Sequence, residues 1–155
     1  VTFGMLGATE GHYRALESKV AGMVRASISS AGNIAQQMLL AGYGSAGYRA
    51  QKAAKLETLR ARYERVKKVL RQHPEFAESY VPLPFNSGYF MCVDVRGAAA
   101  EQVRKVLLRD FDTGVIVLSG LIRLAYSSVP LDRIDELFAN LDAAVRKVKT
   151  EETTQ

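Results

Sequence analysis

One arginine lies inside an apolar, strand-like segment, where a charged side chain needs a partner. The segment runs from Leu121 to Tyr126, and Arg123 stands near its centre. Side chains alternate across a strand, so Arg123 points to the same face as Leu121 and Ala125. Because an unpaired buried charge is costly and the guanidinium fork matches a carboxylate, a substrate carboxylate is a natural partner. A structural ion pair and a place on the exposed side of an edge strand are the other interpretations.

Other residues that carry chemistry are sparse in this sequence. His12 and His73 lie far apart, and no further ligands join them at metal-binding spacing, so we expect no metal site. Cys92, the single cysteine, has no intrachain disulfide partner and is interpreted as a small buried hydrophobe. A lone unpaired cysteine fits a reducing, cytoplasmic compartment. No serine stands in the strand–turn–helix context of a nucleophile elbow.

The composition is that of an ordinary globular domain. The chain has 155 residues, of which 48% are hydrophobic and 24% are charged, and this length is enough to bury a core. No apolar run is long enough to cross a bilayer, and the first residues do not resemble a signal peptide. We therefore expect no membrane partner.

The positive charge is concentrated in one predicted helix, residues 48–72. This helix holds nine lysines and arginines but only two acids, and the net charge of the chain is +5. A stand-alone helical module that binds an acidic partner is therefore an alternative function. The helix has no interleaved aromatic platform for bases, and a solvated helix face explains the same pattern, so we expect no nucleic-acid partner.

Apolar periodicity and turn residues predict an α+β fold, with a small, mostly antiparallel sheet covered by helices and preceded by long helices. Val1 to Phe3 resembles a strand fragment, and Ser30 is a candidate helix cap. The predicted helices cover about 12–25, 30–42, 48–72, 98–109 and 130–148, and the strands cover 88–95, 114–118 and 121–126. The apolar run over 88–95 is typical of a strand buried on both faces, and residues 81–84 are expected to be extended. The expected buried stripe of the last helix is Ile134, Leu137, Leu141 and Val145. The predicted organisation is a first unit over 1–47, a second over 48–148 and a disordered polar tail over 149–155.

Three motifs in the second unit resemble a known family. Asn86 to Met91, Asp112 to Ile116 and Leu121 to Ser128 have the residues, order and spacing of the C-terminal domain of fold-type-I pyridoxal-phosphate-dependent aminotransferases (class I/II, aspartate aminotransferase-like). The resemblance implies that 1–47 is the end of the large cofactor domain with connecting helices. It also implies that 48–148 is the C-terminal small domain, in which Arg123 grips the substrate α-carboxylate.

A second arginine gains a role from the same resemblance. The segment from Met23 to Ser30 is similar to the one that carries an arginine into the neighbouring subunit's site, where it reads the side-chain carboxylate of aspartate or glutamate. Arg25 falls on that position. Ser30 and Ala31 depart from the Asn-Pro that the dicarboxylate enzymes usually show there. An arginine that interacts with the carbonyl dipole at a helix end is the other interpretation.

The resemblance also implies a cofactor and partners that this chain does not supply. The Schiff-base lysine and the phosphate-binding arginine are expected upstream of Val1, since Lys19 and Lys52 lie in helices with the wrong surroundings. We expect pyridoxal 5'-phosphate in the intact parent and none in this fragment, which should be catalytically silent. The expected partners are the N-terminal large domain, a second copy in a homodimer, an amino acid and a 2-oxo acid. A decarboxylase or a lyase on the same scaffold stays open.

A fragment of this kind should expose apolar surface on its first two helices. The expected patch lies around Leu16, Val20, Ile34 and Met38. Large exposed apolar patches mark missing partners, so we expect self-association or a disordered N-terminal third. The ordered core is expected between about 48 and 148.

Overall fold

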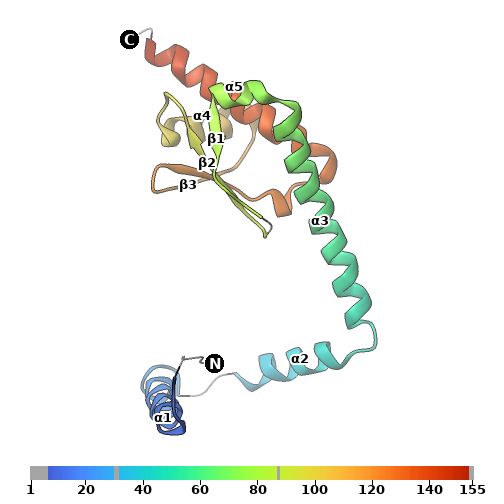
Figure 1. Ribbon diagram of the computed structural model, residues 1–155, viewed down its shortest axis with the longest axis vertical. Helices are drawn as coiled ribbons and strands as arrows, with labels where there is room; N and C mark the ends of the chain where they lie inside the picture. The colour runs from blue at the N-terminus through green and yellow to red at the C-terminus, as the bar shows by residue number, and fades with distance from the viewer. Residues whose placement is uncertain (1–6, 30–31, 87, 154–155) are drawn as a thin grey trace. The chain divides into compact units, whose positions relative to one another are not determined.

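The computed structural model describes residues 7–29, 32–86 and 88–153. The predicted strand from Val1 to Phe3 and the predicted cap at Ser30 lie outside these residues. The chain divides into two compact units, residues 1–49 and 50–155 (Figure 1). None of the described helices is both long and apolar enough to cross a lipid bilayer.

The first unit consists of α1 (Glu10–Ser27) and α2 (Asn33–Gly44). The N–H of Thr9 donates to His12 Nδ1 at 3.0 Å, which caps the start of α1. Neither helix has a buried residue. The expected exposure of Ile34 and Met38 is confirmed, since they are 78% and 70% exposed.

Nearly all of α3 (Tyr48–Gln72) belongs to the second unit, and this helix has the predicted bounds and ends before Pro74. A four-stranded, fully antiparallel sheet follows in the order β1-β2-β4-β3, which confirms the predicted α+β class. The remaining elements are η1 (Pro74–Glu78), β1 (Tyr80–Pro82), β2 (Met91–Val95), α4 (Ala100–Phe111), β3 (Ile116–Leu118), β4 (Leu121–Leu124), η2 (Tyr126–Ser128), η3 (Leu131–Arg133) and α5 (Ile134–Thr153).

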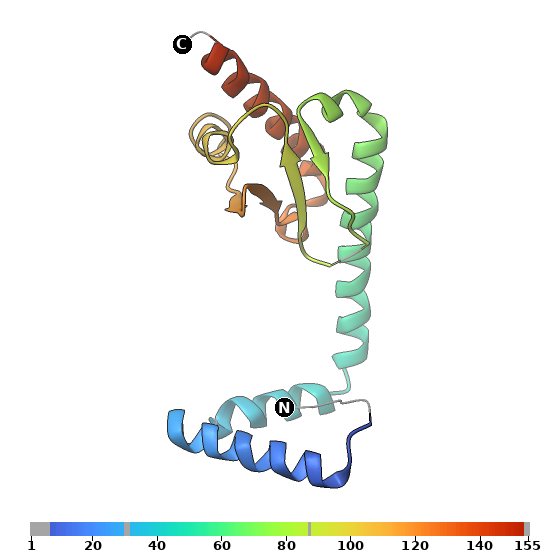
Figure 2. The same cartoon turned by 60° about the vertical axis from the view of Figure 1, so that its left-hand side comes forward.

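The two faces of the sheet differ. Met91 and Val93 of β2 are buried, whereas Asp94 is exposed, so the prediction that this strand is buried on both faces is wrong. Alternation along the strand sends every second side chain into the core and the others away from it. The buried face packs against α4 and α5 (Figures 1 and 2).

The described core belongs entirely to the second unit. Its apolar side chains come from the end of α3, the sheet, α4 and α5. The predicted stripe of the last helix is confirmed, because Ile134, Leu137, Leu141 and Val145 are all buried. Fully buried side chains of this size each contribute about 1.5–3 kcal/mol relative to exposure, so this stripe holds α5 on the sheet.

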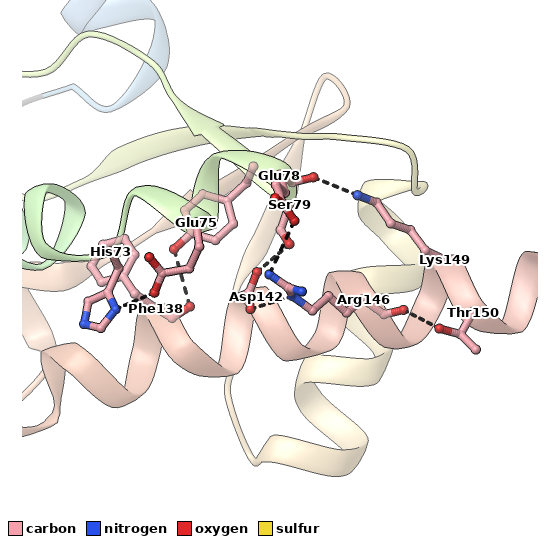
Figure 3. Close-up of polar contacts among 10 residues, drawn as sticks. His73, Glu75, Glu78, Ser79, Phe138, Asp142, Arg146, Lys149 and Thr150 are labelled. Atoms are coloured by element: carbon pink, nitrogen blue, oxygen red, sulfur yellow. Dashed lines mark hydrogen bonds and ion pairs between the residues drawn. The ribbon is translucent and has the colours of Figure 1, made fainter.

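A polar cluster joins α5 to the start of the sheet (Figure 3). Ser79, which is buried, donates from Oγ to Asp142 Oδ1 at 2.5 Å. Arg146 Nε donates to Asp142 Oδ2 at 2.9 Å, and Lys149 Nζ donates to the Glu78 carbonyl at 2.8 Å. These bonds satisfy polar groups at the edge of the core and fix α5 against η1.

The last helix is longer than the sequence predicts. It continues to Thr153 instead of ending at Val148, so the predicted disordered tail over 149–155 is wrong as far as Thr153. Lys149 holds the Glu78 carbonyl, and Thr150 Oγ1 bonds the Arg146 carbonyl at 3.0 Å. These contacts stabilise the helical conformation of the polar residues Lys149 and Thr150. Residues 154 and 155 lie outside the described residues.

Candidate functional site

Arg123 lies on an inner strand of the sheet. It pairs with Cys92 of β2 on one side and with Ile116 of β3 on the other, so its side chain shares the open face of the sheet. The buried neighbours along β4, Ile122 and Leu124, point to the opposite face. The edge-strand interpretation of Arg123 is therefore wrong, and the guanidinium emerges half-buried from the middle of the sheet.

The Phe90 ring contacts the guanidinium of Arg123. The guanidinium carbon lies 4.5 Å from the centroid of the Phe90 ring, within the range of a cation–π interaction. No carboxylate of the described residues forms an ion pair with Arg123. The interpretation of Arg123 as half of a structural ion pair thus has no carboxylate to support it among the described residues. The N–H donors of a guanidinium match the two oxygens of a planar carboxylate.

Two hydrogen bonds hold the segment that carries this ring. Tyr126 Oη donates to the Gly88 carbonyl at 2.8 Å, and the Ser127 N–H donates to the Tyr89 carbonyl at 3.3 Å. Burial raises the pKa of the Tyr126 phenol, so the hydroxyl stays protonated as the donor. Gly88 has φ +96°, a conformation that a residue with a Cβ rarely adopts. The backbone of the Gly-Tyr-Phe motif thus positions the Phe90 ring beside Arg123.

Residues on α3 complete this frame, although no sequence pattern predicts a part for them in the site. Arg62 Nη1 donates to the Ser127 carbonyl. Tyr63 packs edge-on against Phe85, with ring centroids 5.7 Å apart and an interplanar angle of 83°. Phe85 in turn contacts the Tyr126 ring. The aromatic at position 85, directly before the Asn86 motif, was the available signal, but periodicity alone does not connect it to a distant helix.

A mainly apolar hollow of about 550 Å³ lies next to this frame. It is formed by one face of α3 and by the segment before Phe90. Its lining residues are Leu56, Leu59, Arg60, Tyr63, Gly88 and Tyr89. The hollow therefore borders Gly88 and Tyr89, which precede Phe90.

Arg25 belongs to the first unit. It lies in the last turn of α1 and is exposed, as expected for a cation near the carbonyl end of a helix. Ser30 and Ala31, which depart from the resembled pattern, lie outside the described residues. Since Arg25 and Arg123 belong to different units, the role of Arg25 stays a prediction.

The basic face of α3 is partly neutralised by neighbouring groups. Arg60 pairs with Glu64 at 3.4 Å, and Arg65 pairs with Asp135 at 2.6 Å. These pairs neutralise part of the charge of residues 48–72. The alternative of a basic-helix binding module has no support in these contacts.

The residues present do not fit the cofactor that the resemblance implies. Every lysine of the chain lies on a helix, and none is buried. Among the described residues, no group of three or more His, Cys, Asp or Glu is arranged to hold a metal ion. None of the lysines therefore offers an enclosed amine for a Schiff base.

Comparisons with known proteins agree with the fold of the chain. An aminotransferase from Anaerococcus prevotii is 18% identical with a TM-score of 0.70, and the match covers 89% of this chain and 33% of that one. An aromatic aminotransferase from Pyrococcus horikoshii is 15% identical with a TM-score of 0.53, and the match covers 68% of this chain and 29% of that one. The chain thus spans a third or less of the length of these two proteins, and a search of curated proteins found no match. A family model for aminotransferase class I and II matches residues 2–141, so the chain belongs to that family.

Proposed function

We propose that this chain is the C-terminal part of a pyridoxal-phosphate-dependent aminotransferase that transfers an amino group between an amino acid and a 2-oxo acid. One observation carries the proposal. Arg123 presents a half-buried guanidinium on an open sheet face, over the Phe90 ring and without a carboxylate partner among the described residues. A site of this chemistry is suited to a ligand carboxylate.

The task of Arg123 in this proposal is orientation. A guanidinium that binds both carboxylate oxygens fixes the substrate in position and in rotation, because two parallel bonds define a plane. The contact with the Phe90 ring restrains the guanidinium, which lowers the entropy lost on binding. Holding the reacting carbon in one place converts binding energy into rate.

The cofactor itself would be held elsewhere in the protein. Pyridoxal phosphate supplies an electron sink for the substrate carbon when it is bound. Because no lysine of this chain is buried, we propose that the Schiff-base amine and the phosphate ligands come from a large domain outside this sequence. That domain would also cover the exposed apolar side chains of α1 and α2.

The test is a comparison of Arg123→Ala and Arg123→Lys in the intact enzyme. Charge-assisted hydrogen bonds contribute about 1.5–3 kcal/mol each, so losing two should lower kcat/KM for the amino acid about a hundredfold or more. Arg123→Lys should also fall substantially, since an ammonium cannot copy the fork. Arg104→Ala is the matched control, because Arg104 bonds Glu101 on the surface of α4. Normal turnover in Arg123→Ala would refute the assignment.

A more specific version of the proposal concerns Arg25 and the substrate. We propose that the parent is a cytoplasmic homodimer with aspartate or glutamate as substrate, in which Arg25 reads the side-chain carboxylate in the partner's site. The support is its exposed position at the end of α1 and the need of a dicarboxylate for two guanidinium partners. An isologous interface would give each site one such arginine.

Amino donors separate this form from a structural role of Arg25. We expect Arg25→Ala in the intact enzyme to lose activity with aspartate by about tenfold or more, with alanine as donor little changed. Arg14→Ala is the control, since Arg14 lies on α1 in an exposed pair with Glu10. An equal fall for aspartate, alanine and phenylalanine would show that Arg25 is structural.

A further inference from the structure

Arg62 on α3 connects to the strand end that carries Arg123. Its Nη1 donates to the main-chain carbonyl of Ser127, in the η2 turn that follows β4. The N–H of Ser127 donates in turn to the Tyr89 carbonyl at 3.3 Å. The peptide groups of one residue thus join Arg62 to the 88–90 segment.

That segment ends at the ring under Arg123. Phe90 is 48% exposed, and the centroid of its ring lies 4.5 Å from the Arg123 guanidinium carbon. A half-exposed ring has few packing neighbours to fix it, so its place depends on the backbone that carries it. The Tyr126 hydroxyl bond to the Gly88 carbonyl restrains this backbone, and the Arg62–Ser127–Tyr89 connection restrains it further, beside the pairing of Met91 with Leu124 in the sheet.

The contacts of Arg62 are poorly suited to a purely stabilising role. Its Nε is buried and has no hydrogen-bond partner among the described residues. A buried donor without a partner costs free energy, and an apolar side chain of similar length would avoid that cost. Arg65, on the same helix, instead completes an ion pair with Asp135 at 2.6 Å. Arg65 thus helps to hold α3 in place, whereas Arg62 donates its hydrogen bond to the turn after Arg123.

We infer that Arg62 is a positioning residue for the carboxylate site. Its guanidinium holds the Ser127 peptide, which holds Tyr89 and thereby the Phe90 ring beneath Arg123. The inference rests on the proposed function of Arg123, which contacts the substrate, whereas Arg62 acts through the backbone.

The geometric part is tested in the 155-residue chain by NMR. The side-chain Nε–H resonance of Arg123 carries a ring-current shift from Phe90, and Phe90→Leu defines the value without it. We expect Arg62→Met to fold and to move this resonance most of the way to the Phe90→Leu value. The matched control, Arg65→Met, should leave it in place. A wild-type resonance in folded Arg62→Met would overturn the inference, and so would failure of Arg62→Met to fold, which would assign Arg62 to stability.

The functional part is tested by kinetics of the intact enzyme. Displacement of a binding group by about an ångström can cost up to about a hundredfold, so Arg62→Met should raise KM for the amino acid about tenfold with a smaller change in kcat. Arg62→Lys should restore part of this, since an ammonium can still donate to the Ser127 carbonyl. Normal substrate binding by Arg123→Ala would overturn the proposed function itself. A wild-type KM in Arg62→Met, with binding impaired in Arg123→Ala, would overturn only the inference about Arg62.

Discussion

The bond between Ser79 and Asp142 should be a main polar support of the second unit. Ser79 is 1% exposed, and its hydroxyl donates to a carboxylate that is also held by Arg146 (Figure 3). Hydrogen bonds to charged groups contribute about 1.5–3 kcal/mol, and a buried group left unpaired costs about as much again. We expect Ser79→Ala to lower the free energy of unfolding by about 2 kcal/mol and Asp142→Ala by about 3 kcal/mol.

A double-mutant cycle isolates this bond from the rest of the cluster. The double variant should lose only about 3.5 kcal/mol, which leaves a coupling energy of about 1.5 kcal/mol between the two side chains. Urea unfolding of the chain, followed by circular dichroism, measures all four proteins, and the m-values should agree. Arg146→Ala is the control, because a side chain that is 51% exposed should cost less than about 1 kcal/mol. A coupling energy below about 0.5 kcal/mol would refute the reasoning.

Two further predictions concern stability in acid and the reactivity of the lysines with pyridoxal phosphate. The hydrogen bond from Arg109, followed by that from Lys147, holds the pKa of the Asp110 carboxyl well below its usual range. This depressed pKa stabilises the fold above the ordinary pKa of about 4, and the contribution is lost as the pH falls below that value. The stability difference between wild type and Asp110→Asn should therefore be largest near neutral pH and vanish in acid; a constant difference would contradict this. Borohydride reduction of the chain mixed with pyridoxal phosphate should leave no lysine stoichiometrically labelled, because none is buried, and one fully labelled lysine would disprove it.

The fold could be predicted from the sequence where a pattern is long. The bounds of α3 match because Pro74 stops a sustained apolar seam. The three-residue strand β1 (Tyr80–Pro82) was expected only as an extended stretch, since three residues carry too little periodicity to indicate pairing. The helical extension to Thr153 was missed because it depends on Lys149, whose partner is a carbonyl distant in sequence.

The site could be predicted only in part, for a similar reason. Arg123 can be predicted because a charged residue inside an apolar strand can be recognised from the sequence alone. Its stack on Phe90 depends on register and on a glycine with positive φ at Gly88, which a motif suggests but spacing cannot measure. Arg62 looked like one more charge on a basic helix, because its hydrogen bond is to a backbone carbonyl, which has no sequence signature.

Ligand binding without turnover tests the role of Arg123 most directly. The dissociation constant of a 2-oxo acid, and of a neutral analogue with the same carbon skeleton but no carboxylate, is measured by calorimetry for the intact enzyme and Arg123→Ala. Loss of about 3 kcal/mol of charge-assisted bonding should weaken the 2-oxo acid about a hundredfold and leave the neutral analogue within about twofold. Equal weakening of both ligands, or no weakening of either, would show that Arg123 does not bind the carboxylate.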